Sequence, residues 1–212
     1  THTTWAVPGM DSDAANGLAG MDESSLNLYW AQRDLDGFSG RRNAVVAWLG
    51  YDTPGAPPGD WGVVGSEYAL AAAPRLAAEL DGQFAARSAG GEGVPVTSVL
   101  AHSYGTTVAT IALTMVAHPV DALVMLGSAG LDTDAVPTLD ALNVKEVSSG
   151  QRAIYTAHAS GDHLAPTGAG AARRGQPNPD ATAPFGLQNY SPVYGGALLF
   201  SAEGDPSRGL LA

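Results

Sequence analysis

The feature that most constrains the fold is a regular alternation between short apolar runs and longer segments with helical spacing. The apolar runs span residues 3–9, 43–52, 94–103, 120–130, 152–162 and 196–205. Within each run the hydrophobicity is continuous, which is typical of strands buried on both faces of a parallel sheet. The chain therefore predicts an α/β fold of three layers, a mainly parallel sheet flanked by helices.

Three of the intervening segments have helical spacing, at 22–35, 66–88 and 105–117. In the first of these, Asp22 or Ser24 is expected to cap the helix. Its expected apolar face consists of Leu26, Tyr29, Trp30 and Leu35. A Pro- and Gly-rich segment at 163–195 has neither pattern and is expected to form a long loop. No linker composition interrupts the sequence, so residues 1–212 are expected to form one domain.

Composition excludes several classes of function. The net charge is −11 and the few basic residues form no cluster, so nucleic acid is not an expected partner. No apolar run approaches the roughly 18 residues of a membrane span. The absence of cysteine excludes a thiolate metal site and a cysteine nucleophile, and the sequence calls for no metal or other cofactor. No signal peptide is visible, and a cytoplasmic and a secreted location both stay open.

The sequence AHSYG at residues 101–105 places a serine between a predicted strand and a predicted helix. It matches the nucleophile pattern G-x-S-x-G, with Ala101 in the first position and Gly105 in the last. Small residues are needed there because the turn is strained and presents the serine hydroxyl above the carboxyl end of the sheet. Ser103 is therefore the candidate nucleophile. The alternative is that Ser103 only caps the helix that follows it.

Two backbone N–H groups are candidate donors to a developing oxyanion. One belongs to Tyr104, directly after the candidate nucleophile. The other belongs to Met10, in the loop after the first predicted strand. Because both donors are backbone groups, neither leaves a side-chain signature in the sequence.

A serine nucleophile needs a histidine base and an acid, in the chain order serine, acid, histidine. Asp162 ends the fifth predicted strand and is the expected acid, and Asp132, after the fourth, is its competitor. No histidine follows His163, so two alternatives stay open for the base. Either His163 reaches Ser103 from the loop beside Asp162, or the histidine lies beyond Ala212 on a continuation of the chain.

Three segments together resemble an actinobacterial family of α/β-hydrolase-like proteins of unknown function. They are VVAWLGYDTP at 45–54, VLAHSYGTTVA at 99–109 and LVMLGSAGLD at 123–132. The resemblance implies an α/β-hydrolase fold, Ser103 as nucleophile, Asp162 as acid and a histidine shortly after the last strand. Because the sequence ends at GDPSRGLLA, the resemblance also implies that a C-terminal segment is missing. Ala101 and Ala129 stand where the family commonly has Gly and Pro.

These observations predict a serine hydrolase that acts on small-molecule or lipid esters. The alternative is a catalytically silent α/β-hydrolase fold used for binding or assembly. The substrate entrance is expected between the loops 53–65 and 163–195, with Trp61, Tyr190 and Tyr194 as its apolar walls. The sequence does not indicate an oligomeric state.

Overall fold

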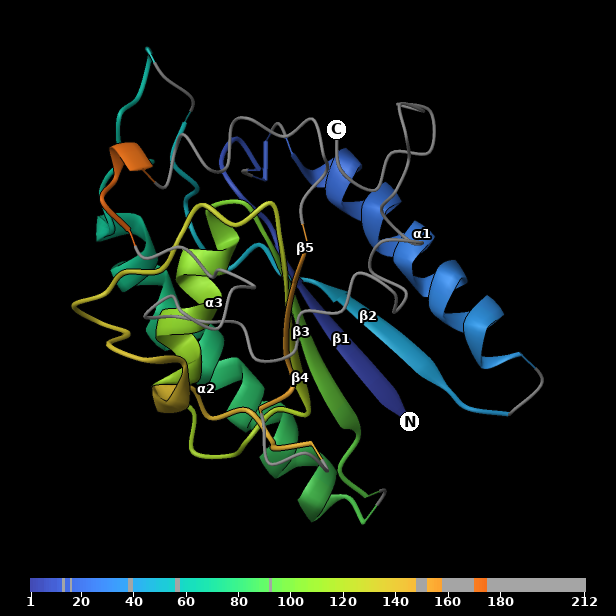
Figure 1. Cartoon of the computed structure of the whole chain (residues 1–212). Helices are drawn as coiled ribbons and strands as arrows, with labels where there is room; N and C mark the ends of the chain where they lie inside the picture. The colour runs from blue at the N-terminus through green and yellow to red at the C-terminus, as the bar shows by residue number, and fades with distance from the viewer. Residues whose placement is uncertain are drawn as a thin grey trace.

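The computed structural model describes residues 1–12, 14–15, 17–37, 40–55, 58–91, 93–147, 152–157 and 170–174 (Figure 1). The expected strand 196–205 and most of the expected loop 163–195 lie outside these ranges. So do the expected wall residues Tyr190 and Tyr194.

Within the described ranges, five parallel strands form one sheet in the order β2-β1-β3-β4-β5. They are β1 (His2–Val7), β2 (Asn43–Ala47), β3 (Val96–His102), β4 (Ala122–Leu126) and β5 (Ile154–Ala157). The expected parallel sheet is confirmed.

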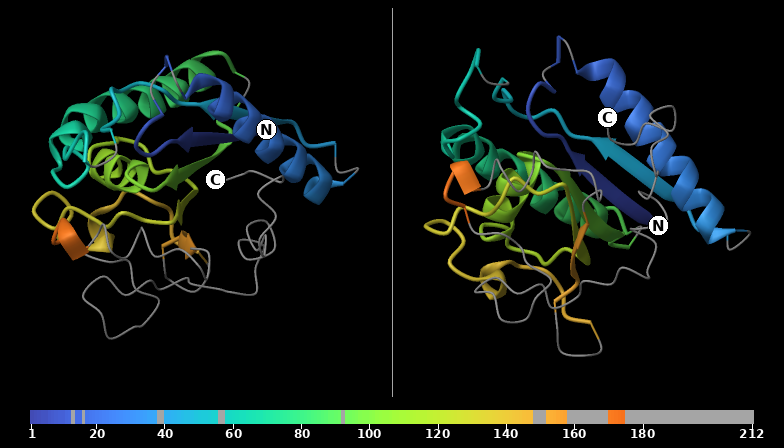
Figure 2. Two further views of the ribbon diagram at one scale, coloured as in Figure 1. Left: turned by 90° about the horizontal axis from the view of Figure 1, so that it is seen from above. Right: turned by 45° about the horizontal axis from the view of Figure 1, so that its top comes forward.

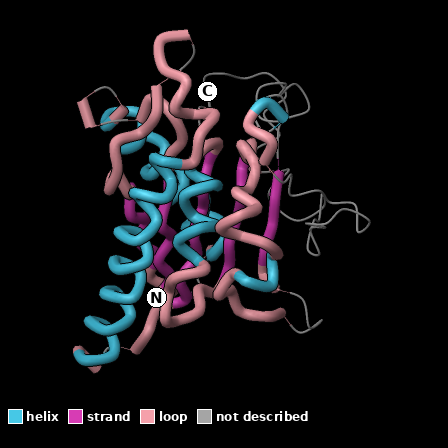
Figure 3. The backbone as a smooth tube through the Cα atoms, turned by 90° about the vertical axis from the view of Figure 1, so that its left-hand side faces the viewer, coloured by secondary structure: helices cyan, strands magenta, loops and turns pink. Residues whose placement is uncertain are grey.

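Three α-helices of the described residues cover the two faces of the sheet. α1 (Leu18–Asp36) lies on one face, and α2 (Glu67–Ala89) and α3 (Gly105–Leu113) lie together on the other (Figures 1 and 2). Figure 3, viewed from the side of α2 and α3, shows helices in front of the strands. The three-layer arrangement agrees with an α/β-hydrolase fold.

Small side chains let α2 and α3 pack closely under the sheet. The buried residues of α2 follow the helical repeat and are mostly alanine: Ala69, Ala72, Ala73, Leu76, Ala77 and Leu80. Every residue of α3 is buried, and none of its side chains carries a charge. The threonines in α3 satisfy their hydroxyls within the protein, as Thr110 does by donating to the Thr106 carbonyl oxygen at 2.8 Å.

The strand order places a topological switch point at β1. β1 pairs with β2 on one side and with β3 on the other, so the chain reverses its direction across the sheet at this strand. In open parallel sheets, ligands bind in the crevice outside the carboxyl ends of the strands at such a point. A ligand site is therefore expected at the residues after β1 and β3.

The first helix differs from the sequence expectation. It begins at Leu18, with Gly17 in the N-cap position, so Asp22 and Ser24 lie inside the helix and cap nothing. Its buried positions are Ser25 and Leu28. Three residues of the expected apolar face are instead exposed, namely Leu26, Trp30 and Leu35. The helix packs through a narrow, partly polar stripe, where Gln32 Nε2 donates to Thr4 Oγ1 at 2.8 Å.

The strands are shorter than the apolar runs that predicted them. The run 120–130 contains a strand only over Ala122–Leu126, and the turn that follows uses positive φ at Gly127 and Gly130. The run 43–52 likewise ends its strand at Ala47, before the loop that contains Gly50 and Tyr51. The apolar residues at these strand ends pack in loops at the carboxyl edge of the sheet. Among the described residues, no helix is long and apolar enough to cross a membrane.

Candidate active site

Ser103 lies in the tight turn between β3 and α3, at the carboxyl edge of the sheet. Its φ angle is 52°, in the left-handed region, and the residue is half-buried. A residue with a Cβ loses roughly 1–2 kcal/mol in this conformation, so surrounding contacts must hold it there. An αL serine between a strand and a helix is the backbone geometry that the G-x-S-x-G pattern requires.

The small residues that flank Ser103 have a steric explanation. A Cβ at Gly105 would collide with the carbonyl oxygens of Val7 and Pro8, because the start of α3 presses directly on the end of β1. Ala101 is fully buried within the sheet. The alanine that replaces the usual first glycine therefore fits, whereas a side chain at position 105 would not.

The side chain of Ser103 faces the loop that follows β1. A Cβ built on Gly9 would lie 2.7 Å from Ser103 Cβ and 3.1 Å from Ser103 Oγ. This contact places the hydroxyl between the ends of β1 and β3, at the switch point of the sheet. No described residue forms a hydrogen bond with Ser103 Oγ.

Hydrogen bonds on both sides hold the backbone of this turn. Ser103 N–H donates to the Leu126 carbonyl oxygen at 2.9 Å, and its own carbonyl oxygen accepts from Ala129 N–H at 3.3 Å. Thr106 Oγ1 also donates to the Ser103 carbonyl oxygen, at 2.7 Å, and lies 2.9 Å from Ser128 Oγ. The end of β4 and the loop after it thus hold the strained conformation of the turn.

The two expected oxyanion donors belong to the residue directly after Ser103 and to the loop after β1. Tyr104 is the N-cap residue of α3, and Met10 follows Gly9 in the loop after β1. Within the described part of the chain, neither backbone N–H donates to a carbonyl oxygen. The first N–H groups of a helix also carry the positive end of its dipole, which favours negative charge at this position.

The segment Tyr51–Pro54 holds the loop that carries Met10. The buried hydroxyl of Tyr51 donates to the Pro8 carbonyl oxygen at 2.8 Å. Farther along, Asp11 N–H donates to the Pro54 carbonyl oxygen at 3.0 Å, and Ser12 N–H to Thr53 Oγ1 at 3.1 Å. Sequence reasoning identified residues 51–54 only as part of a family motif. It missed that they hold the loop after β1, because this role depends on contacts between two loops that are distant in the sequence.

Tyr104 points away from the sheet edge into the core and contacts the start of α2. Its fully buried hydroxyl donates to the Gly65 carbonyl oxygen at 2.9 Å and accepts from Ala69 N–H at 3.3 Å. Burial raises the pKa of the Tyr104 hydroxyl, so this group stays protonated. The loop that carries the exposed Trp61 is therefore tied to the residue directly after Ser103.

The competing acid, Asp132, is engaged in local structure. Its Oδ1 accepts hydrogen bonds from the backbone N–H groups of Asp134 and Ala135, at 3.0 and 3.1 Å. Burial raises the pKa of Asp132, but hydrogen bonds from Ser66 and these two N–H groups, with the charge of Arg174, outweigh burial and leave the pKa below its usual range. Asp162, the expected acid, lies outside the described residues.

Three of the five histidines are described, and two of them lie far from Ser103 along the strands. His2 begins β1, at the amino edge of the sheet. His118 follows α3 and precedes β4, at the same edge, where its Nδ1 lies 3.0 Å from Asp81 Oδ1 and its ring stacks on Phe84. His102 is the last residue of β3 and is half-buried. His158 and His163 lie outside the described residues.

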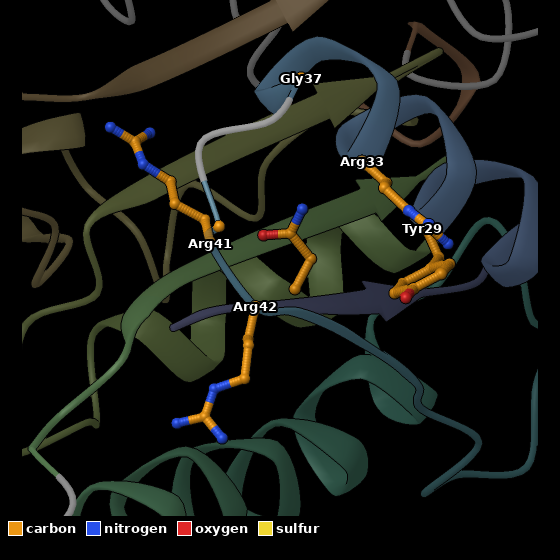
Figure 4. Close-up of a pocket in the computed structure, with 7 residues that line it drawn as sticks. Tyr29, Arg33, Gly37, Arg41 and Arg42 are labelled. Carbon is orange, nitrogen blue, oxygen red and sulfur yellow. The ribbon is translucent and has the colours of Figure 1, made fainter.

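A second surface feature lies at the opposite edge of the sheet. A hollow of about 540 Å³ lies between the end of α1 and the start of β2. Its lining consists of Tyr29, Arg33, Gly37, Gly40, Arg41, Arg42 and Asn43. Figure 4 shows the side chains of Arg41 and Arg42 pointing away from one another, so they do not converge on one ligand. Elsewhere, the described residues contain no group of three His, Cys, Asp or Glu side chains that could hold a metal ion.

Comparison with known proteins agrees with this fold. A family model described as alpha/beta hydrolase matches residues 2–165, which is most of the chain. The chain belongs to the alpha/beta hydrolase family. No curated protein and no solved structure matches it significantly. The family resemblance read from the sequence is thus confirmed at the level of the α/β-hydrolase fold.

Proposed function

We propose that this alpha/beta hydrolase family member is a serine hydrolase that cleaves carboxylic esters, with Ser103 as its nucleophile. The observation that carries the proposal is the left-handed backbone of Ser103, with its hydroxyl against Gly9 at the switch point of the sheet. A serine that only capped α3 would need neither the strained φ nor the missing side chains at positions 9 and 105. Strain that the neighbouring loops maintain is typical of functional positions.

In the proposed reaction, Ser103 Oγ attacks the ester carbonyl carbon while a histidine accepts the hydroxyl proton. The carbonyl oxygen becomes an oxyanion, which the N–H groups of Met10 and Tyr104 stabilise by hydrogen bonds. The intermediate collapses as the C–O bond to the alcohol breaks, and the histidine returns the proton to the leaving alcohol. Water then attacks the acyl-serine by the same steps, releasing the acid and restoring Ser103.

Asp162 is proposed as the acid that orients the histidine, because it follows a later strand in the order that this fold requires. For the base, His163 and a histidine on a continuation past Ala212 stay as alternatives. His163→Ala in the 212-residue chain separates them. An active 212-residue chain that loses ester hydrolysis on His163→Ala assigns the base to His163. A nearly inactive 212-residue chain that gains activity when it is extended past Ala212 assigns the base to the continuation, and full activity that survives His163→Ala rejects both alternatives.

The proposal is tested with a fluorophosphonate probe and with p-nitrophenyl esters. Only an activated serine reacts quickly with the probe, so the unaltered chain should label and Ser103→Ala should not. Ser88→Ala is the matched control, since Ser88 is exposed in the last turn of α2, away from the carboxyl edge of the sheet. Labelling or hydrolysis that persists in Ser103→Ala rejects the proposal. An unaltered chain that never labels, and that still does not label when it is extended past Ala212, would instead favour a silent binding module.

A further inference from the structure

We propose that Arg174 is a positioning residue for this site, because its guanidinium joins Tyr104, the entrance loop 63–65 and the loop after β4. The inference rests on the proposed function, in which Tyr104 N–H stabilises the oxyanion. Sequence reasoning did not select Arg174, which lies in the segment 163–195 that was expected to be a loop without regular structure. In Figure 1 the short orange segment 170–174 lies beside the loop that precedes α2.

The guanidinium of Arg174 donates to carbonyl oxygens of two different loops. Nη2 donates to Val63 at 3.0 Å, to Val64 at 3.4 Å and, through a very short hydrogen bond, to Gly65. Nη1 donates to Ala129 at 3.4 Å. One side chain therefore connects the loop before α2 with the loop after β4.

Arg174 is connected to the Ser103 turn in two ways, through Tyr104 and through Ala129. The guanidinium carbon of Arg174 lies 4.9 Å from the centre of the Tyr104 ring, within the range of a cation–π interaction. Tyr104 OH donates to the same Gly65 carbonyl oxygen that Arg174 binds. On the other side, Ala129 accepts from Arg174 through its carbonyl oxygen and donates its N–H to the Ser103 carbonyl oxygen at 3.3 Å.

Because Arg174 is buried, loss of these contacts would destabilise the protein. Only 9% of the residue is exposed, and burying a charge is costly unless hydrogen bonds compensate it. Among the described residues no carboxylate forms an ion pair with Arg174, so carbonyl oxygens and the Tyr104 ring supply its direct contacts. The negative charges of Asp132 and Glu67 act on it from a longer distance. Burial lowers the pKa of Arg174, but a guanidinium stays protonated in proteins, so the charge is permanent.

These contacts give Arg174 a specific effect on geometry. The direction of the Tyr104 backbone N–H depends on the position of the Tyr104 ring and on the Ser103 turn. Arg174 contacts the ring directly and reaches the turn through Ala129. Without the guanidinium, Gly65 and Ala129 each lose a donor and the Tyr104 ring loses its cation. We expect the oxyanion donor and Ser103 to shift together, while the loop 61–66, which carries Trp61, becomes more mobile.

The first test compares Arg174→Met with Arg173→Met. Arg173 is the adjacent exposed residue, so the control removes the same charge from the same segment. For Arg174→Met we expect kcat to fall about 10²-fold, the effect of a misplacement near 1 Å, with KM changed less than about threefold. Arg174→Lys should recover part of kcat, because lysine restores the charge but not the planar fork. Rates are divided by the concentration of probe-labelled serine, which removes the effect of any unfolded fraction.

The inference is overturned if Arg174→Met keeps the kcat of the unaltered chain for each labelled site, or if Arg173→Met loses as much. If Arg174→Met does not fold, Arg174→Lys and Tyr104→Phe take its place. Tyr104→Phe removes only the Tyr104 hydroxyl, which donates to the same Gly65 carbonyl oxygen as Arg174. A full kcat in both variants contradicts the inference.

A second measurement needs no turnover and so separates this inference from the proposed function. Hydrogen–deuterium exchange should become faster at residues 61–66 and 103–107 in Arg174→Met, or in Arg174→Lys if the methionine variant does not fold. It should stay unchanged there in Arg173→Met. If the unaltered chain does not hydrolyse esters, the proposed function fails and this exchange pattern alone decides the role of Arg174. Unchanged exchange in these segments overturns the inference.

Discussion

Ser103 stands against Gly9 so closely that residue 9 has no room for a side chain. A Cβ placed on Gly9 would lie 2.7 Å from Ser103 Cβ, closer than any ordinary contact between two carbon atoms. The two residues come from loops that follow neighbouring strands, β1 and β3, at the switch point of the sheet. Their contact fixes the position of the proposed nucleophile relative to the proposed oxyanion donor on Met10.

Gly9→Ala should therefore impair catalysis more than folding. The added methyl group has to displace Ser103, and a displacement near 1 Å costs roughly 10²-fold in rate. Gly82→Ala is the control, because nothing lies within 4 Å of its added Cβ on α2. That change should raise stability by about 0.5–1 kcal/mol, as alanine favours a helix over glycine. A p-nitrophenyl ester assay and thermal unfolding of both variants check the prediction, which fails if Gly9→Ala keeps full activity.

Ser103→Gly should stabilise the protein while removing its activity. The φ angle of 52° is strained for serine and free of strain for glycine. Relief of that strain, offset in part by the greater freedom of glycine in the unfolded chain, should leave a gain of up to about 1 kcal/mol. Ser103→Ala keeps the strain and should unfold at nearly the same temperature as the unaltered chain. Equal midpoints for Ser103→Gly and Ser103→Ala would show that the turn is not strained.

The sequence predicts the layers of this fold better than it predicts the helix surfaces. Continuous apolar runs predict the strands of a parallel sheet, and all five described strands lie within or close to such runs. The edge strand β2 is less buried than expected, since Ala44 and Ala47 are exposed. The prediction for the face of α1 is wrong because an amphipathic pattern assumes that apolar residues point inward. Here Leu26, Trp30 and Leu35 are exposed while Ser25 is buried. Local spacing does not reveal which stripe of a helix meets the sheet.

The candidate site is predictable where it depends on one contiguous motif. Ser103, with Ala101 and Gly105, can be found from spacing because the turn itself demands small residues. Arg174 and Tyr51 could not be found in that way, since their roles arise from contacts with residues more than 40 positions away. Buried side chains that bind distant carbonyl oxygens leave no local pattern in a sequence.

Asp132→Asn should lower kcat far less than Asp162→Asn. The carboxylate of Asp132 already accepts two backbone N–H groups in its own turn, and an asparagine oxygen can accept both. For Asp162→Asn the proposed role predicts a loss of about 10⁴-fold in kcat, as expected where the tautomer of a catalytic histidine is no longer fixed. Steady-state kinetics on the two variants compares them directly. A larger loss in Asp132→Asn would exchange the roles of the two acids.

Asp132 should also make stability depend on pH. Its pKa is lowered in the folded protein, because its hydrogen bonds and the charge of Arg174 outweigh the effect of burial. A lowered pKa stabilises the fold above the unfolded value of about 3.9, and this contribution is lost as the pH falls through the folded pKa. Asp132→Asn should therefore unfold at a lower temperature than the unaltered chain at pH 7, with a smaller difference near pH 3. A difference independent of pH would contradict this assignment.

Tyr51→Phe should weaken both the fold and the proposed catalysis. The change leaves the Pro8 carbonyl oxygen without its hydroxyl donor in a buried position, which costs about 1–2 kcal/mol. In a chain of this size that loss lowers the unfolding midpoint by several degrees, at about 2–4 °C for each kcal/mol. Because Pro8 directly precedes Gly9 and Met10, kcat for each labelled serine should fall while KM changes little. Tyr29→Phe, on the half-buried part of α1, should change neither quantity. An unaltered kcat for each labelled serine in Tyr51→Phe would show that this tyrosine supports the fold alone and that the loop holding Met10 keeps its geometry without it.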